Sequence, residues 1–158
     1  MISPELQKAI DCLQIQDVYL RGLSAGCADN FEPKYHDDYE RLIFQTRHYV
    51  KKTNVVELND DPRMMRVFID LGVRWVEESA AGEEAPVKAF IEAEFVAEYT
   101  MTEDLEQAAI DAFSLQNVSF HVWPYWRELL HNQCSRMHLP QAVLPAIQLA
   151  QNRESSSQ

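Results

Sequence analysis

With 158 residues, 46% of them hydrophobic, and a formal net charge of −11, the sequence predicts one acidic globular domain with a core of its own. A charge of this sign argues against a nucleic-acid partner, and no apolar run approaches the roughly 20 residues that span a bilayer, so we expect no membrane insertion. The N-terminus does not resemble a signal peptide, and the three cysteines are scattered without a C-x-x-C pair, which together predict a reducing, cytoplasmic location.

The first residues of the chain predict a short helix, from about Ser3 to Gln14. Ser3 can cap this helix through its hydroxyl, and Pro4 suits the first turn, where no backbone N–H is needed. The apolar side chains that follow recur with helical spacing and give the segment a face to bury. They are Leu6, Ile10 and Leu13.

Four strand-like stretches follow and predict an antiparallel sheet. They run from Ile15 to Ala25, from Arg41 to Lys52, from Arg63 to Glu77 and from Val87 to Thr102, and a long polar and aromatic connection separates the first two. In the last two stretches apolar residues alternate with their neighbours, which is the period of a strand with one buried face. The predicted buried faces consist of Met65, Val67, Ile69, Leu71, Val73 and Trp75, and of Val87, Ala89, Ile91, Ala93, Phe95, Ala97, Tyr99 and Met101.

A helical period returns after the sheet. A first helix is predicted to begin near Thr102, and a break near Asn117 separates it from a second helix over Val118 to His138. Pro124 either kinks this second helix or lies in its first turn.

Together these elements predict an α+β fold. It comprises a four-stranded antiparallel sheet, a short N-terminal helix, a broken long helix packed on the sheet and a short C-terminal segment. We expect residues 1–152 to form a single domain, and residues 153–158, with their serine-rich end, to be a disordered tail.

Two groups of side chains could carry chemistry. His131, Cys134 and His138 lie at i, i+3 and i+7, so one helix could present all three to a zinc ion. No fourth ligand is apparent in the sequence, and we favour the alternative in which the histidines face solvent and Cys134 packs in the core. Carboxylates of the fourth strand could act as acid and base, but their alternate spacing is that of a solvated sheet face; they are Glu92, Glu94 and Glu98. We therefore expect no catalytic residue, no metal site and no cofactor.

An aromatic cluster lies early in the second long helix. Phe120, Trp123, Tyr125 and Trp126 are close together in the sequence, and one helix face cannot bury so many large side chains. We expect part of the cluster to pack in the core and part to form a surface at which copies of the chain associate. The predicted oligomer interface consists of Phe120, Trp123, Tyr125, Trp126 and Leu130.

The order of elements and two motifs resemble the SecB family of chaperones. The stretch from Asn117 to Glu128, with its Pro-Tyr-Trp-Arg-Glu end, is similar to that family's Phe-Pro-Tyr-Ala-Arg-Glu helix. Leu139 to Pro145 resembles the family's proline-bounded loop, Phe-Pro-Gln/Pro-Leu-x-Leu-Ala-Pro. Weaker matches in the first and fourth strands, at Ile15 to Tyr19 and at Ala89 to Glu94, extend the resemblance from about Ile15 to Leu149.

The resemblance implies a function as well as a fold. Members of the family are homotetramers, dimers of dimers in which first strands pair across the dimer. They hold unfolded polypeptide without ATP in apolar grooves, which are formed by the connection after the first strand and by the C-terminal segment. The corresponding client-binding groove residues in this chain are Phe31, Tyr35, Tyr39, Leu139, Val143, Leu144, Ile147 and Leu149.

Departures from the family pattern indicate a specialised member. Export-dedicated members carry acidic residues on the first strand, which bind the translocation ATPase SecA, whereas Arg21 to Gly26 of this chain include no acid. The C-terminal segment also ends in a serine-rich stretch instead of a full helix. These differences favour a chaperone for one dedicated client, the antitoxin of a toxin–antitoxin–chaperone module. A general export chaperone is the first alternative, and an enzyme that binds a metal or a small molecule is the second.

Overall fold

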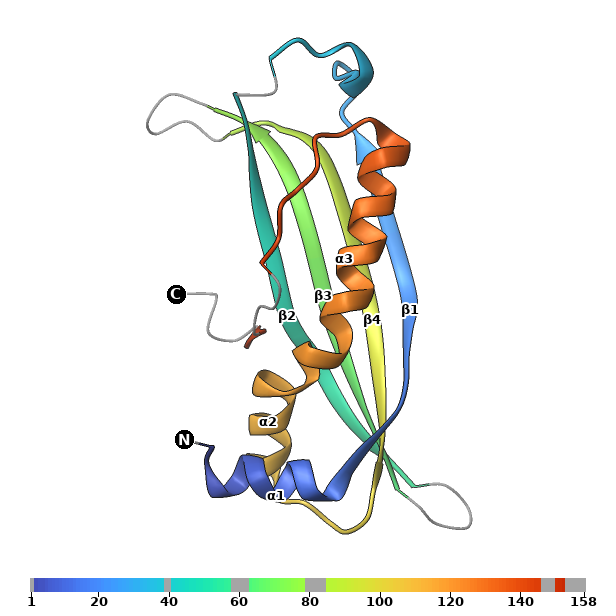
Figure 1. Ribbon diagram of the computed structural model, residues 1–158, viewed down its shortest axis with the longest axis vertical. Coiled ribbons are helices and arrows are strands. Elements are labelled where there is room, and N and C mark those ends of the chain that lie inside the picture. The colour runs from blue at the N-terminus through green and yellow to red at the C-terminus, as the bar shows by residue number, and fades with distance from the viewer. Residues whose placement is uncertain (1, 39–40, 58–62, 79–84, 146–149, 153–158) are drawn as a thin grey trace.

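The computed structural model describes residues 2–38, 41–57, 63–78, 85–145 and 150–152 of the chain. Four long strands lie between a short N-terminal helix and two C-terminal helices (Figure 1). In chain order the elements are α1 (Pro4–Cys12), β1 (Leu13–Cys27), η1 (Pro33–Tyr35), β2 (Leu42–Val56), β3 (Met64–Glu77), β4 (Val87–Met101), α2 (Gln107–Gln116), α3 (Val118–Met137) and β5 (Gln151–Asn152).

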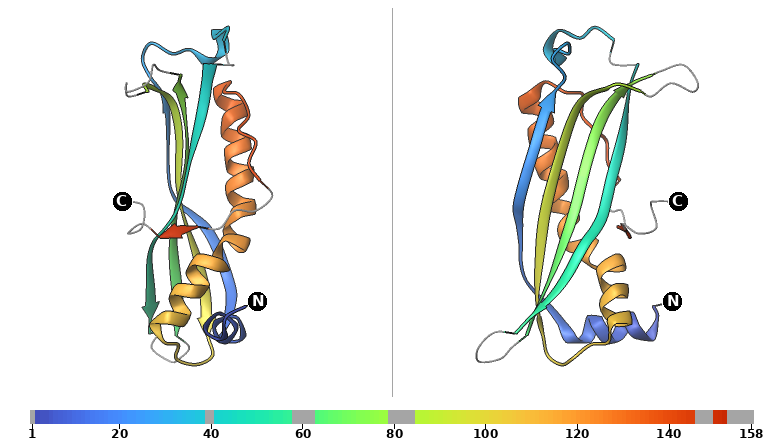
Figure 2. Two further views of the ribbon diagram at one scale, coloured as in Figure 1. Left: turned by 90° about the vertical axis from the view of Figure 1, so that its left-hand side faces the viewer. Right: turned by 180° about the vertical axis from the view of Figure 1, so that it is seen from behind.

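The strands form one sheet in the order β1-β4-β3-β2-β5. The four long strands are antiparallel to their neighbours, and the two-residue strand β5 pairs in parallel with β2. Both α2 and α3 lie against one face of the sheet, which we call the inner face (Figure 2). The predicted α+β fold is therefore confirmed, while β5 was not predicted. Within the described residues, no helix is both long and apolar enough to cross a membrane.

The N-terminal helix begins as predicted but ends earlier. The Ser3 hydroxyl accepts a hydrogen bond from the Leu6 amide at 3.2 Å, and Pro4 lies at the first helical position. The backbone of Leu13 is already extended, with φ −105° and ψ 127°, because Leu13 starts β1 and pairs with Met101 of β4. Leu13 is buried as expected, but as the first residue of a strand and not as part of the helix.

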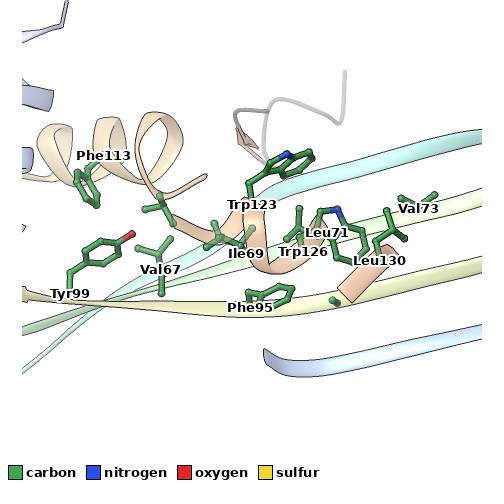
Figure 3. Close-up of a cluster of buried hydrophobic side chains, with 14 of the residues drawn as sticks. Val67, Ile69, Leu71, Val73, Phe95, Tyr99, Phe113, Trp123, Trp126 and Leu130 are labelled. Carbon is green, nitrogen blue, oxygen red and sulfur yellow. The ribbon is translucent and has the colours of Figure 1, made fainter. Parts of the chain in front are cut away.

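The alternation of β3 and β4 produces the core. All residues of the two predicted faces are buried except Val87, which lies at the start of β4. α3 places Trp123, Trp126 and Leu130 over this surface, as Figure 3 shows. The ring of Phe113, from α2, packs edge-on against Tyr99 of β4, with 5.0 Å between ring centroids. Burial of these large side chains is the main source of stability for the fold.

The break between the two C-terminal helices lies at Asn117, as predicted. The first of them begins at Gln107 and not near Thr102, because the Thr102 amide donates a hydrogen bond to the Cys12 carbonyl and is tied to the end of α1. Pro124 lies inside α3, beyond its first turn. The helix ends where His138 adopts a left-handed conformation, with φ 56°, that turns the chain back along the sheet.

Candidate functional site

Two grooves flank α3, and only the first is lined by residues of the sheet. The first, which we call the β1-side groove, has a volume of about 490 Å³. It is lined by Val18, Tyr19, Leu20 and Phe95 of the sheet and by Tyr125, Glu128, Leu129, Asn132, Gln133 and Arg136 of α3. The second, the tail-side groove, has a volume of about 470 Å³ and lies between α3 and the residues that follow it. It is lined by Arg127, Glu128, Leu130, His131, Asn132, Gln141, Ala142, Val143 and Leu144.

The β1-side groove continues along an apolar stripe on the edge strand. Ile15, Leu20 and Leu23 are 42%, 41% and 44% exposed, although their partners in β4 place them on the inner face. The described residues leave more than 40% of each of these side chains exposed, although α3 lies beside them. Apolar side chains grouped in this way mark a surface that binds another chain.

Two bulges in β1 create this stripe. The pairing with β4 shifts between Ile15 and Asp17 and again between Leu20 and Gly22, so each shift inserts one extra residue. An extra residue changes which positions face inward, because side chains alternate across a strand. The inner face of β1 therefore carries residues at uneven spacing, which are Leu13, Ile15, Val18, Leu20, Leu23, Ala25 and Cys27. A search for strict alternation misses this surface. Our groove prediction did not include it either, because that prediction followed the resemblance to the SecB family.

The tail-side groove contains part of the predicted client-binding set. Val143 is 82% exposed at its rim, and Leu144 is half-buried and packs against the core. Leu139 is buried directly after α3, where its amide donates to the Cys134 carbonyl. Gln141 holds this segment to the helix, because its side-chain amide donates to the Ser135 hydroxyl at 3.0 Å.

The connection after β1 contributes less apolar surface than the prediction assumed. Tyr35 is 73% exposed, with the Lys34 ammonium 5.5 Å from its ring centroid. Phe31, also predicted to line the groove, is buried in the main core. The remaining predicted groove residues, Tyr39, Ile147 and Leu149, lie outside the described residues.

The predicted interface residues divide into two groups. Phe120 and Tyr125 are 54% and 49% exposed, and Tyr125 lines the β1-side groove. Trp123, Trp126 and Leu130 are buried within the protomer, so their assignment to an interface is corrected. The three share one side of the helix because their spacing, i, i+3 and i+7, follows the helical repeat, and this side faces the sheet.

A polar cluster joins α3, β2 and the end of the chain. His48 of β2 is buried, shares a hydrogen bond of 3.3 Å with the Ser119 hydroxyl and stacks on Trp123, with ring centroids 5.2 Å apart. Burial lowers the pKa of His48 to about 4, so its ring is neutral at pH 7. The Ser119 hydroxyl also accepts from the Ala150 amide at 3.2 Å, and the Trp123 indole donates to the Pro145 carbonyl at 2.9 Å.

The groups considered for chemistry do not converge. Cys134 is buried whereas His131 and His138 are exposed, and no three His, Cys, Asp or Glu side chains among the described residues could share a metal ion. Burial raises the pKa of the Cys12 and Cys134 thiols, which makes both poor nucleophiles. The carboxylates of β4 lie on the outer face, where they pair with cations of β1, β2 and β3. The pairs are Glu92 with Arg47, Glu94 with Arg21 and Lys51, and Glu98 with Arg66.

Comparison with known proteins identifies the fold. No family model matches the sequence, and no curated protein matches it significantly. The structure is similar to that of the SecB-like chaperone of Mycobacterium tuberculosis, solved in complex with a ChAD peptide from the HigA1 antitoxin. The two share 18% sequence identity and a TM-score of 0.70, over 92% of this chain and 98% of that one. The chain therefore has a SecB-like fold, as its motifs predicted.

Proposed function

We propose that the protein is a chaperone that holds an unfolded segment of another polypeptide, without ATP, in the apolar grooves beside α3. The observation that carries this proposal is the exposed apolar stripe of β1, Ile15, Leu20 and Leu23, beside a groove of about 490 Å³. Such a surface suits an extended apolar segment, which buries about 25 cal/mol per Å² of apolar area before the cost of ordering is subtracted.

The client that best fits the proposal is the antitoxin of a toxin–antitoxin–chaperone module. The structural relative was solved with a peptide from an antitoxin, and its fold extends over nearly the whole of this chain. A general export chaperone fits less well. Within Arg21–Gly26 the outer face of β1 carries Gly22, Ser24 and Gly26, where export-dedicated members of the SecB family carry acids, and Arg21 pairs with Glu94.

We propose in addition that the working form is a tetramer, a dimer of dimers. β1 is a 15-residue edge strand, and no described residue forms backbone hydrogen bonds with its free edge. A long unpaired edge readily accepts another strand, so pairing of two β1 strands would close it and join two stripes into one surface. The exposed rings of Phe120 and Tyr125 on α3 are then available for contact between dimers.

Aggregation of an unfolded antitoxin provides the test. The antitoxin is diluted from denaturant, and turbidity is followed with and without the purified protein and with and without ATP. We expect suppression near one tetramer per antitoxin, unchanged by ATP. Equal turbidity with and without the protein contradicts the chaperone proposal. Suppression of unrelated unfolded proteins at the same ratio contradicts only the dedicated client.

A further inference from the structure

The end of the described chain occupies a site between α3 and the β2 edge. Trp123 donates its indole N–H to the Pro145 carbonyl at 2.9 Å, and the Ser119 hydroxyl accepts from the Ala150 amide at 3.2 Å. Gln151 and Asn152 then pair in parallel with Tyr49 and Val50 of β2. All of these contacts are made to the backbone of the tail, by side chains of α3 and by the backbone of β2.

Contacts of this kind recognise an extended backbone and not a particular sequence. A carbonyl acceptor, an amide donor and a strand ladder are offered by any extended polypeptide that carries no proline at the donating positions. The tail itself is uncharged from Pro145 to Asn152, which is also the character of an apolar client segment. The site therefore has the chemistry of a receptor for extended, uncharged polypeptide.

The protein holds this receptor rigidly. His48 stacks on Trp123 and shares a hydrogen bond with Ser119, so one buried ring positions both side chains that contact the tail. Trp123 and Ser119 are themselves buried in α3. By contrast, the tail residues Gln151 and Asn152 form a strand of only two residues, and so short a ladder is weak on its own.

We propose that Pro145 and the residues from Ala150 to Asn152 are an intramolecular competitor that a client segment must displace from this site. This inference rests on the proposed chaperone function and adds a means of regulating it. If a competitor fills a site for most of the time, only a small fraction of the sites is free. The apparent affinity for the client then falls in proportion to that free fraction. A short tail tethered beside its site has a high effective concentration, so weak contacts suffice for this occupancy.

Two truncated chains test the proposal. Deletion of residues 150–158 removes the Ala150 contact and β5, whereas deletion of 153–158 keeps both and is the matched control. The probe is a fluorescently labelled peptide from the antitoxin, too short to fold on its own, and its affinity is measured by anisotropy. We expect the 150–158 deletion to bind the probe about 5- to 10-fold more tightly than the control, as expected if the tail fills the site for most of the time.

A point variant keeps the test valid if the shorter chain does not fold. Ala150→Pro removes the amide that donates to Ser119, while Ala150→Ser retains it, and both side chains are small. We expect Ala150→Pro to bind the probe several-fold more tightly than Ala150→Ser. We also expect faster hydrogen exchange at Tyr49 and Val50 in Ala150→Pro, because β5 is released from β2.

The outcomes separate this inference from the proposed function. Probe binding that is equal in all variants, or weaker without the tail, overturns the competition and leaves the chaperone proposal standing. If no variant and no full-length chain binds the probe, the chaperone proposal fails and the competition fails with it. Equal hydrogen exchange at the β2 edge in Ala150→Pro and Ala150→Ser also overturns the inference, because the tail then does not depend on the Ser119 contact.

Discussion

The two edges of the sheet differ in how they end. At the β1 edge, a 15-residue strand has a free edge with which no described residue pairs. Its inner face carries the exposed side chains of Leu20 and Leu23. At the β2 edge, β5 adds to the sheet and the tail contacts Ser119 and Trp123. One edge is therefore open in the protomer, and the other is occupied by the protein's own chain.

This difference indicates separate roles for the two edges. Exposed edge strands pair readily with other chains, and proteins normally cover, shorten or charge them. β1 is neither short nor covered at its free edge by any described residue, which suits pairing with a second copy. The β2 edge is covered by a segment with few contacts, which suits exchange with a client.

Loss of Trp126 should have the largest effect, because this side chain supports both edges at once. Trp126 is buried between α3 and the strands of the inner face (Figure 3). We expect Trp126→Ala to lower the free energy of unfolding by about 3–5 kcal/mol, as large-to-small changes in a core do. Urea denaturation measures this effect. Tyr125→Ala, next to it but half exposed, should cost less than about 1 kcal/mol. A reversed order would place Trp126, and not Tyr125, at a surface.

Acid should destabilise the protein through the β2 edge. Burial lowers the pKa of His48 to about 4, below the value of about 6.5 expected in the unfolded chain. The unfolded state therefore binds the proton more readily, so stability is complete above about pH 6.5 and is lost as the pH falls toward 4. We expect a loss of about 2 kcal/mol at pH 5 from this residue. The matched variant His48→Phe keeps an aromatic ring and should lose this part of the pH dependence. Parallel stability curves for the two proteins between pH 7 and 4.5 would contradict the assignment.

A charge on the open edge should impair client binding without affecting the core. Leu23 of β1 and Val55 of β2 are both on the inner face and are each 44% exposed, so they form a matched pair. We expect Leu23→Glu to weaken binding of an unfolded polypeptide about tenfold, or about 1.4 kcal/mol, because it places a charge in the apolar stripe. Val55→Glu should change the affinity less than about twofold. Equal effects in an anisotropy titration would show that the stripe is not the binding surface.

The fold could be predicted from the sequence where the hydrophobic pattern is regular. Every predicted inward residue of β3 is buried, and the break at Asn117 and the cap at Ser3 lie where expected. Regular alternation predicts burial well because a strand between two neighbours has one covered face. The start of α2 was predicted too early, because a long-range hydrogen bond from Thr102 to Cys12 keeps that residue out of the helix.

The candidate site was less predictable because its contacts are long-range. The bulges that give β1 its apolar stripe depend on pairing with β4, and the residue types around Arg21 do not predict them. The cluster of His48, Ser119 and Trp123 joins residues from distant parts of the chain. The sequence around each of them predicts only an ordinary strand or helix residue. The aromatic cluster of α3 was recognised, but spacing alone did not show that the two tryptophans face inward while Phe120 and Tyr125 face outward.

The smallest expected effect concerns the outer face of the open edge, where we expect no binding of the zinc-containing C-terminal tail of SecA. In export-dedicated members of the SecB family, acids on the first strand attract this basic partner. Here the outer face of β1 carries Gly22, Ser24 and Gly26 at those positions, and Arg21 adds a cation that is already paired with Glu94 at 3.2 Å. This stretch of β1 offers the tail no carboxylate to accept charge-assisted hydrogen bonds, and Arg21 repels it. Calorimetry with the zinc-loaded tail peptide should therefore detect no affinity tighter than about 100 μM, or about 5.5 kcal/mol.

An export-type SecB provides the positive control, and micromolar binding by this chain would favour the export chaperone over the dedicated one. The same titration on Ser24→Glu separates the two explanations of a negative result: recovery of affinity would show that missing carboxylates are the cause, whereas continued absence would mean that the shape of the β1 edge also differs from that of the export-type proteins.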